Sequence, residues 1–131
     1  MKGQLSLEYL VLSLVAISLL SISIISLFQI KKSVEYYGDL IKFKSSAISL
    51  SDTINELCAL GTGTGRELKL NGAISIEPND YRSDDGWVIR FFSPDLNTSL
   101  VQKSLCSVDA SQINGIVYIK NEDGTIKVRE R

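Results

Sequence analysis

The N-terminal stretch of the chain is apolar without interruption. No charged residue occurs between Tyr9 and Ile30. At about 1.5 Å per residue, this stretch forms a helix of roughly 33 Å, which is long enough to cross a hydrocarbon core of about 30 Å. One carboxylate, Glu8, precedes it, and Lys31 and Lys32 follow it. The pattern predicts a helix that lies in a membrane or in an equally apolar environment.

Small residues are spaced around this apolar stretch: Ser13, Ala16, Ser18, Ser21, Ser23 and Ser26. Small side chains let neighbouring helices approach closely in an apolar medium. Serine hydroxyls can also donate to carbonyls of the preceding helical turn, so they cost little there. These residues fit a helix that packs against other helices, and they fit equally a simple anchor that tolerates serine.

Beyond Lys32 the apolar residues recur at alternating intervals of three and four, the period of an amphipathic helix. They are Leu40, Phe43, Ala47, Leu50, Ile54 and Leu57. The glycines from Gly61 to Gly65 predict the end of the helix, because glycine adopts the left-handed conformation that caps it. We expect one long helix from about Leu5 to Leu60, apolar all round in its first half and amphipathic in its second.

From Arg66 the period changes to two, which predicts β-strands. Residues 67–70 and 73–76 flank Asn71-Gly72, a sequence typical of a hairpin turn. Further strands are predicted at 87–92, which reads as buried, at 100–108, and at 116–120, which is expected to pair with 125–129. The predicted fold class is α+β, with the long helix packed on a small antiparallel β-sheet or β-sandwich domain.

Composition mainly excludes functions. The 131 residues include 14 Lys and Arg against 15 Asp and Glu. The chain therefore has no excess of positive charge that would indicate binding to nucleic acid. The absence of histidine excludes imidazole-based triads and metal sites. Two cysteines are too few for a structural zinc site by themselves, and the glycine run lacks the Lys-Ser/Thr of a phosphate loop. We expect no enzyme activity, catalytic residue, metal or other cofactor.

The first nine residues, Met-Lys-Gly-Gln-Leu-Ser-Leu-Glu-Tyr, resemble the class III signal peptide of archaeal type IV pilin-like proteins. In that family a short basic leader ends in Gly, and cleavage leaves Gln as the first residue. The pattern continues as Gln-x-Ser-x-Glu followed by an aromatic residue, and Gln4, Ser6, Glu8 and Tyr9 match it. The resemblance extends through the apolar helix to about Ile30.

The resemblance implies processing and assembly. A prepilin peptidase would cut between Gly3 and Gln4, while the precursor sits in the cytoplasmic membrane with its C-terminal domain outside. With a cytoplasmic assembly ATPase and a membrane platform protein, the mature chain would form a homopolymeric extracellular filament for adhesion or surface attachment. The implied parts are a leader (1–3), a transmembrane or filament-core helix (4–30), an amphipathic continuation (31–60) and an extracellular β domain (61–131).

Glu8 has a specific role in that implied assembly. A lone carboxylate among packed apolar helices must find a partner. The resemblance implies that the partner is the freed α-amino group of a neighbouring subunit, which would neutralise Glu8 and set the axial register. The motor archaellum is a less favoured form of the same filament.

Alternatives remain open. A non-polymerising membrane-anchored surface protein or binding module needs the same helix but gives Glu8 no role, whereas charges at membrane helices usually mark a partner or a function. A cleaved secretory signal fits less well, because its apolar region is about 7–15 residues long and ends at an A-x-A-like site. The excess of Lys31 and Lys32 over Lys2 favours a cytoplasmic domain, but long domains are translocated largely regardless of charge.

An extracellular location bears on the cysteines and on one asparagine. In an oxidising compartment Cys58 and Cys106 are expected to form a disulfide between the helix and the β domain, with two buried free thiols as the alternative. Asn97 begins an Asn-Thr-Ser sequon for N-glycosylation in a predicted loop. The remaining acidic groups are interpreted as solvated loop charges: Asp80, Asp84 and Asp85, and Glu122 and Asp123.

Overall fold

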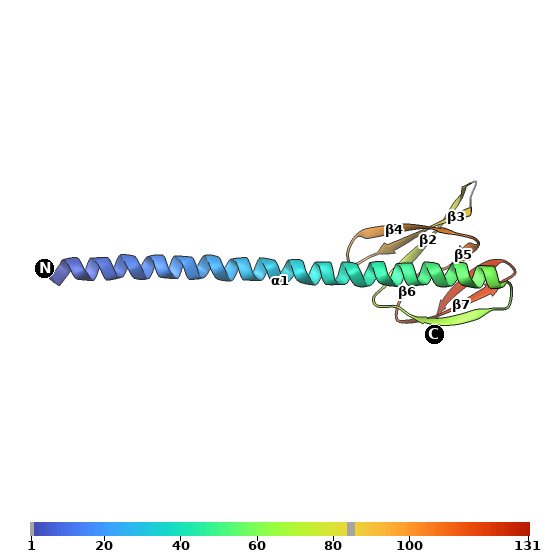
Figure 1. Cartoon of the computed structure of the whole chain (residues 1–131), viewed down its shortest axis with the longest axis horizontal. Coiled ribbons are helices and arrows are strands. Elements are labelled where there is room, and N and C mark those ends of the chain that lie inside the picture. Colours follow the sequence, from blue (N-terminus) through green and yellow to red (C-terminus); the bar gives the residue numbers. More distant parts are fainter. Residues whose placement is uncertain (1, 84–85) are drawn as a thin grey trace. The chain divides into compact units, whose positions relative to one another are not determined.

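The chain forms one long helix followed by short strands (Figure 1). The computed structural model describes residues 2–83 and 86–131, and the side chains of residues 6–77 and 86–131. The helix is α1 (Lys2–Leu60). The strands are β1 (Gly65–Lys69), β2 (Ile74–Ser83), β3 (Gly86–Ser93), β4 (Thr98–Ser104), β5 (Ser107–Asp109), β6 (Gln112–Ile113), β7 (Ile116–Glu122) and β8 (Thr125–Glu130). The predicted α+β class is confirmed.

Contacts divide the chain into two compact units, Met1–Tyr37 and Gly38–Arg131. The described part of the first unit is helical throughout. The second unit contains the remainder of α1 and the strands. Each unit has its own pattern of exposure.

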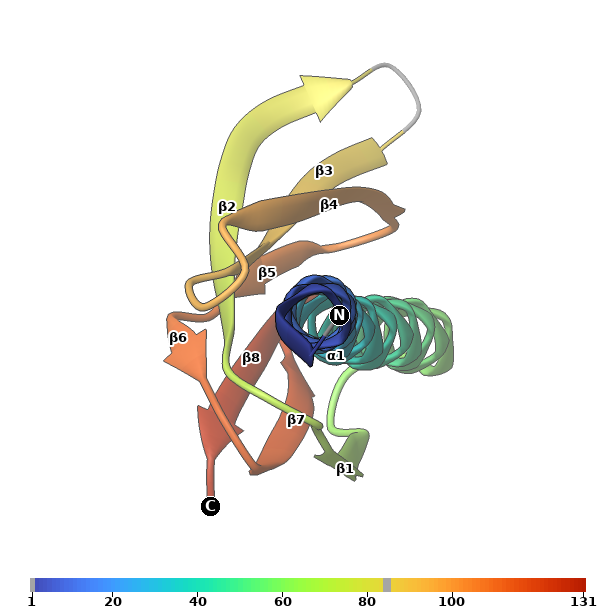
Figure 2. The same cartoon turned by 90° about the vertical axis from the view of Figure 1, so that its left-hand side faces the viewer.

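The second unit holds two sheets of four strands each (Figure 2). In the first sheet the strand order is β1-β7-β8-β5, and the β5–β8 pair is parallel while the other two pairs are antiparallel. In the second sheet the order is β4-β3-β2-β6, with every pair antiparallel. The sheets meet where β2 contacts β5 and β6 contacts β8. This contact leaves β1 and β4 at the other edges.

Residues 38–60 of α1 lie between β4 and β1 (Figure 2). On the β4 side, the Asn55 amide donates to the carbonyl of Lys103 at 3.3 Å and accepts from the backbone N–H of Leu105 at 3.1 Å. On the β1 side, Arg66 pairs with Glu56 at 2.7 Å. An uncovered sheet edge presents backbone groups to other chains. The Asn55 amide satisfies two such groups, in β4 and just after it, whereas the side chains of β1 are mostly exposed.

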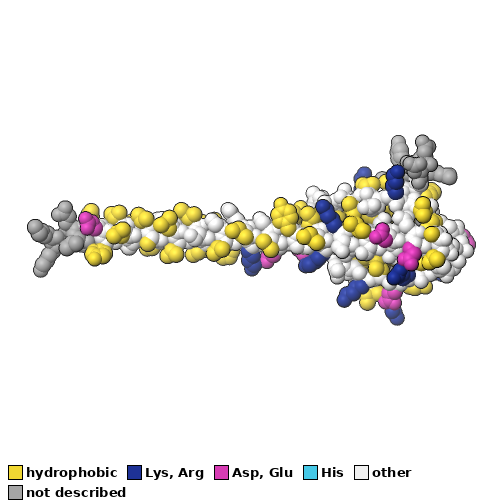
Figure 3. All heavy atoms as spheres, viewed as in Figure 1, with side chains coloured by type: hydrophobic (Ala, Val, Ile, Leu, Met, Phe, Trp, Pro, Cys, Tyr) yellow, Lys and Arg dark blue, Asp and Glu magenta, His cyan; other side chains and the backbone are white. Residues whose placement is uncertain are grey.

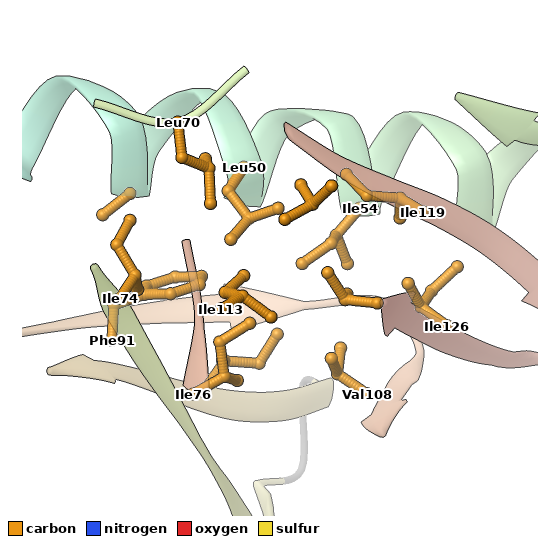
Figure 4. Close-up of a cluster of buried hydrophobic side chains, with 14 of the residues drawn as sticks. Leu50, Ile54, Leu70, Ile74, Ile76, Phe91, Val108, Ile113, Ile119 and Ile126 are labelled. Atoms are coloured by element: carbon orange, nitrogen blue, oxygen red, sulfur yellow. The ribbon is translucent and has the colours of Figure 1, made fainter. Parts of the chain in front are cut away.

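The core of the second unit lies between this part of α1 and the two sheets. Phe43, Ala47, Leu50, Ile54 and Leu57 are all buried, which confirms the predicted helical stripe, while Leu40 is half-buried. Figure 4 shows Leu50 and Ile54 pointing from the helix toward Ile113 and Ile126. The strands contribute Ile74, Ile76, Ile89, Phe91, Val108, Ile113, Val117, Ile119, Ile126 and Val128, and the β1–β2 connection contributes Leu70.

The hairpin predicted at Asn71-Gly72 is wrong. β1 pairs with β7, and β2 pairs with β3 and β6, so the two flanking strands belong to different sheets. A type I′ turn needs positive φ at both central residues, but only Gly72, at 113°, has it. The backbone N–H groups of Leu70 and Asn71 donate instead to the Gly115 carbonyl and to Ser46 Oγ.

The hairpin predicted between residues 116–120 and 125–129 is confirmed. β7 and β8 pair in antiparallel register up to Glu122 and Thr125. The two turn residues, Asp123 and Gly124, have φ values of 53° and 83°, as a type I′ turn requires. The predicted pairing of these strands is therefore present, whereas the strands that flank Asn71-Gly72 have other partners, because tertiary contacts take the backbone N–H groups of Leu70 and Asn71.

The strand predicted at 100–108 is also wrong as one element. It is divided into β4 and β5, which belong to different sheets. The Ser104 hydroxyl closes the bend between them, since it donates to the Cys106 carbonyl at 2.8 Å and accepts from the Cys106 N–H at 3.3 Å. The strand predicted at 87–92 is present within β3, but it is buried on one face only, because Arg90 is exposed between buried Ile89 and Phe91.

Candidate functional site

The apolar segment, residues 4–30 of α1, presents its side chains to the outside. Every large apolar side chain described from Leu7 to Ile30 is at least 50% exposed. Figure 3 shows hydrophobic side chains along this stretch of the helix. Each such side chain gains about 1.5–3 kcal/mol on full burial, and α1 is long and apolar enough to cross a membrane. This exposed apolar surface is compatible with membrane anchoring.

The serines of the apolar segment bond to their own helix. Each hydroxyl donates to a backbone carbonyl three or four residues earlier, at 2.8–2.9 Å. The pairs are Ser13 with Leu10, Ser18 with Leu14, Ser21 with Ile17, Ser23 with Leu19 and Ser26 with Ile22. This is the back-bonding expected from the sequence. It leaves these five hydroxyls satisfied in a medium without water.

The predicted processing residues lie at the start of α1. Gly3 and Gln4 belong to its first turns, and their side chains lie outside the described part of the chain. Glu8 is exposed and has no hydrogen bond or ion pair within the described residues. An isolated carboxylate is costly in hydrocarbon. In such surroundings Glu8 requires a partner that the described part of the chain does not supply.

Cys58 and Cys106 form the predicted disulfide, and the alternative of two free thiols is wrong. Their Cα atoms are 6.0 Å apart, and 48 residues separate them in sequence. Cys58 lies in the last turns of α1, and Cys106 lies in the bend between β4 and β5. In the chain-entropy model a loop of this size contributes about 4 kcal/mol. The disulfide ties the C-terminal end of α1 to the strands.

Asn121 of β7 is a second tie that the sequence did not reveal. This residue is 2% exposed. Its amide donates to the carbonyl of Leu57 at 3.0 Å, and its side-chain oxygen accepts from the N–H of Gly124 at 3.1 Å. The Thr64 hydroxyl also approaches the Leu57 carbonyl, at 3.3 Å. Asn121 thus satisfies a carbonyl that the end of a helix leaves without a partner. No local signal marks it, because Leu57 lies 64 residues earlier in the chain.

Asn97 lies in the turn between β3 and β4. Its side chain is exposed, and its φ of 47° is left-handed, a conformation that asparagine tolerates better than most residues. The sequon is therefore accessible at the surface of the second unit. Its glycosylation stays a prediction.

The second unit has a cleft of about 610 Å³ between α1, the β1–β2 connection and the β3–β4 turn. Asp39 and Lys42 at its rim pair with each other at 3.0 Å. Its other lining residues are Phe43, Asn71, Gly72, Ala73, Ser93, Asp95 and Leu96. No group of three His, Cys, Asp or Glu side chains that could hold a metal occurs among the residues the structure describes. We assign no reaction to this cleft.

Of the acidic groups noted in the sequence, Glu122 has a defined environment. It pairs with Lys127 at 2.7 Å and with Lys120 at 3.1 Å. Hydrogen bonds from Lys127, and then from Lys120, lower the pKa of Glu122 from its ordinary 4.5 to about 2. Glu122 is therefore part of a partly exposed ion-pair group on the β7–β8 hairpin. The side chains of Asp80, Asp84 and Asp85 lie outside the described residues.

Comparison with known proteins gives no relative from which a function could be transferred. No family model matches the chain, and no curated protein or solved structure matches it. The features of the chain that bear on function are the apolar segment, Glu8 and the ties between the second unit's strands and α1.

Proposed function

We propose that this chain is a pilin-like structural subunit, cut between Gly3 and Gln4 by a prepilin peptidase. It assembles through residues 4–30 into an extracellular type IV-like filament that serves adhesion or surface attachment. The observation that carries the proposal is the exposed apolar segment headed by Glu8, which lacks a partner within the described residues. The archaeal pilin-like pattern at Gln4, Ser6, Glu8 and Tyr9 supports it.

Membrane insertion and then assembly cover the same apolar surface, one after the other. In the membrane, lipid covers the apolar side chains of residues 4–30. In the filament, neighbouring copies cover them, and the small serines allow those helices to approach closely. By the resemblance, a cytoplasmic assembly ATPase and a membrane platform protein drive the transfer.

Glu8 provides a specific contact between subunits in the filament. Removal of residues 1–3 creates an α-amino group at Gln4, and by the resemblance this cation pairs with Glu8 of a neighbouring subunit. Opposite charges held in an apolar core stabilise only when both are present, because one partner alone is an uncompensated buried charge. Cleavage therefore both frees the helix for assembly and creates the partner of Glu8.

The second unit supports this function by holding its part of α1 firmly. The disulfide, Asn121 and Asn55 attach residues 55–58 of the helix to the strands. A filament transmits load along its helices, so a subunit needs a helix that cannot separate from its own domain. These ties are consistent with that requirement.

The processing step is tested by mass spectrometry of the N-terminus of the protein purified from its own cells. We expect a mature chain that begins at Gln4. A chain that retains Met1, or one cut after Ile30, contradicts the proposal.

The assembly step is tested by replacing Glu8 with Ala or Gln. Loss of one member of a buried ion pair costs about 3 to 5 kcal/mol, so incorporation into filaments should fall at least roughly a hundredfold while cleavage continues. Glu35→Ala is the matched control, because Glu35 is an exposed carboxylate on the same helix beyond the apolar segment. Equal incorporation of the Glu8 variants and the control would instead favour a non-polymerising membrane-anchored surface protein.

A further inference from the structure

The polar side chains change their hydrogen bonding where the apolar segment ends. Up to Ser26, the five serines named above donate to their own helix. From Gln29 onward, a set of polar side chains makes no hydrogen bond or ion pair within the described residues. This set lines one shallow groove on α1 and consists of Gln29, Lys32, Ser33, Tyr36 and Tyr37. All five belong to the first unit.

The chemistry of this groove favours an anion. An amide, an ammonium and three hydroxyls can all donate hydrogen bonds, and no carboxylate lines the groove. Two acidic residues lie nearby in sequence: Glu35 pairs with Lys31 at 3.8 Å, and Asp39 pairs with Lys42 at 3.0 Å. The rings of Tyr36 and Tyr37 meet edge to face, with centroids 5.9 Å apart. A phosphate, with several acceptor oxygens and negative charge, complements such a set of donors.

The position of the groove identifies the source of that phosphate. The charge-free helix from Tyr9 to Ile30 is roughly 33 Å long, which matches a hydrocarbon core of about 30 Å. Residues 29–37 then lie at the level of the lipid headgroups when the helix spans a membrane. Lysine and tyrosine are favoured there, because their apolar parts stay in the lipid while their polar ends reach the interface.

We propose that the groove lined by Gln29, Lys32, Ser33, Tyr36 and Tyr37 binds the phosphate of a membrane lipid headgroup. The proposal requires that α1 lie in a membrane before assembly, and it does not require that the chain polymerise. In a filament subunit, this contact would have to be released when the helix leaves the membrane.

The test uses the full chain in detergent micelles, with native mass spectrometry to measure retained lipid. The probes are phosphatidylglycerol, an uncharged glycosyl diacylglycerol without phosphate, and inorganic phosphate as a soluble competitor. The variants are Lys32→Gln, which removes the charge, and Tyr36→Phe, which keeps the ring and removes the hydroxyl. Lys44→Gln is the matched control, because Lys44 is an exposed lysine of α1 outside the groove.

We expect the wild type and Lys44→Gln to retain phosphatidylglycerol equally and to retain little of the phosphate-free lipid. A lysine near an anionic lipid surface contributes a factor of about five, so Lys32→Gln should retain about fivefold less. Tyr36→Phe should retain about threefold less, as expected for one lost hydrogen bond. Circular dichroism should show unchanged helix content.

Three results would overturn the proposal. One is equal retention of phosphatidylglycerol by both groove variants and the wild type. Another is equal retention of the phosphate-free lipid, which would indicate a non-specific interfacial belt. The third is competition by millimolar inorganic phosphate, which would indicate a soluble anion as ligand. None of these results bears on filament assembly, which the Glu8 variants test separately.

Discussion

Leu20 and Leu50 belong to the same helix and have opposite surroundings. Leu20 is 63% exposed, whereas Leu50 is fully buried. Residue type and backbone conformation are the same, so the difference arises from what covers each side chain. Around Leu50 the two sheets supply the cover. Around Leu20 no described strand of the second unit's core supplies cover, and the exposed surface is compatible with membrane anchoring.

The polar groups follow the same division. In the apolar segment, serine hydroxyls bond within the helix, so the segment can move between apolar environments without losing these bonds. At the C-terminal end of α1, Asn55, Cys58 and the Leu57 carbonyl are bonded to residues at least 48 positions away. The polar groups of the apolar segment thus bond within the helix, whereas those at the C-terminal end of α1 are bonded to distant parts of the chain.

Removal of the disulfide should have the largest effect on the second unit. We expect the double variant Cys58→Ser and Cys106→Ser to lose about 4 kcal/mol of unfolding free energy, because the open chain gains entropy when it unfolds. Urea unfolding of the full chain in micelles, followed by the fluorescence of Trp87, measures this loss. A variant as stable as the wild type would show that the other ties suffice to hold the helix.

Matched leucine variants compare the two parts of α1 directly. Leu50→Ala should cost about 3 kcal/mol of unfolding free energy, because it leaves a cavity in the core. Leu20→Ala should leave the unfolding of the second unit unchanged, since Leu20 is not part of that core. The same urea titration measures both variants. Equal losses would contradict the division of the helix.

Asn121→Ala tests the tie at the end of α1. It removes one donor to the Leu57 carbonyl and the acceptor of the Gly124 N–H, which should cost about 2 kcal/mol. Asn114, an exposed asparagine just before β7, provides the control. Asn114→Ala should change the unfolding free energy by less than about 0.5 kcal/mol. Similar values for the two variants would mean that Asn121 has no special role.

The smallest effect concerns Glu122 and appears only on acidification. Because the pKa of Glu122 is lowered from 4.5 to about 2 in the folded chain, its ion pairs stabilise the fold above the ordinary pKa. That contribution is lost as the pH falls from about 4.5 toward 2. Glu122→Gln should therefore flatten the pH dependence of unfolding in this range, and Asp123→Asn on the adjacent turn should not. The effect is small because the side chains are partly exposed and screened.

Local sequence patterns predicted the elements better than their partners. The helix, the buried stripe from Phe43 to Leu57 and the pairing of β7 with β8 all follow from signals within a few residues. The Asn71-Gly72 signal failed because Leu70 and Asn71 donate to groups from β7 and α1 elsewhere in the fold. A strand pattern shows where a strand lies, but it does not show which sheet the strand joins.

The candidate site divides in the same way. The apolar segment, the position of Glu8 and the pair Cys58 and Cys106 were apparent from the sequence, since charge-free length, a lone carboxylate and cysteine count are one-dimensional properties. The hydrogen bonds of Asn121 and Asn55, and the groove that begins at Gln29, were not apparent from the sequence. Their roles depend on whether a polar atom finds a partner, and that is known only when side chains are placed in space.

The amino-acid pattern alone predicts a helix that is apolar all round before it becomes amphipathic, because apolar residues three and four positions apart lie on one face of a helix. The division of the eight described strands between two sheets, and the ties between them and the end of α1, are visible only in the folded chain. Those choices depend on competition for backbone hydrogen bonds and on burial among residues far apart in the chain, which no local pattern records.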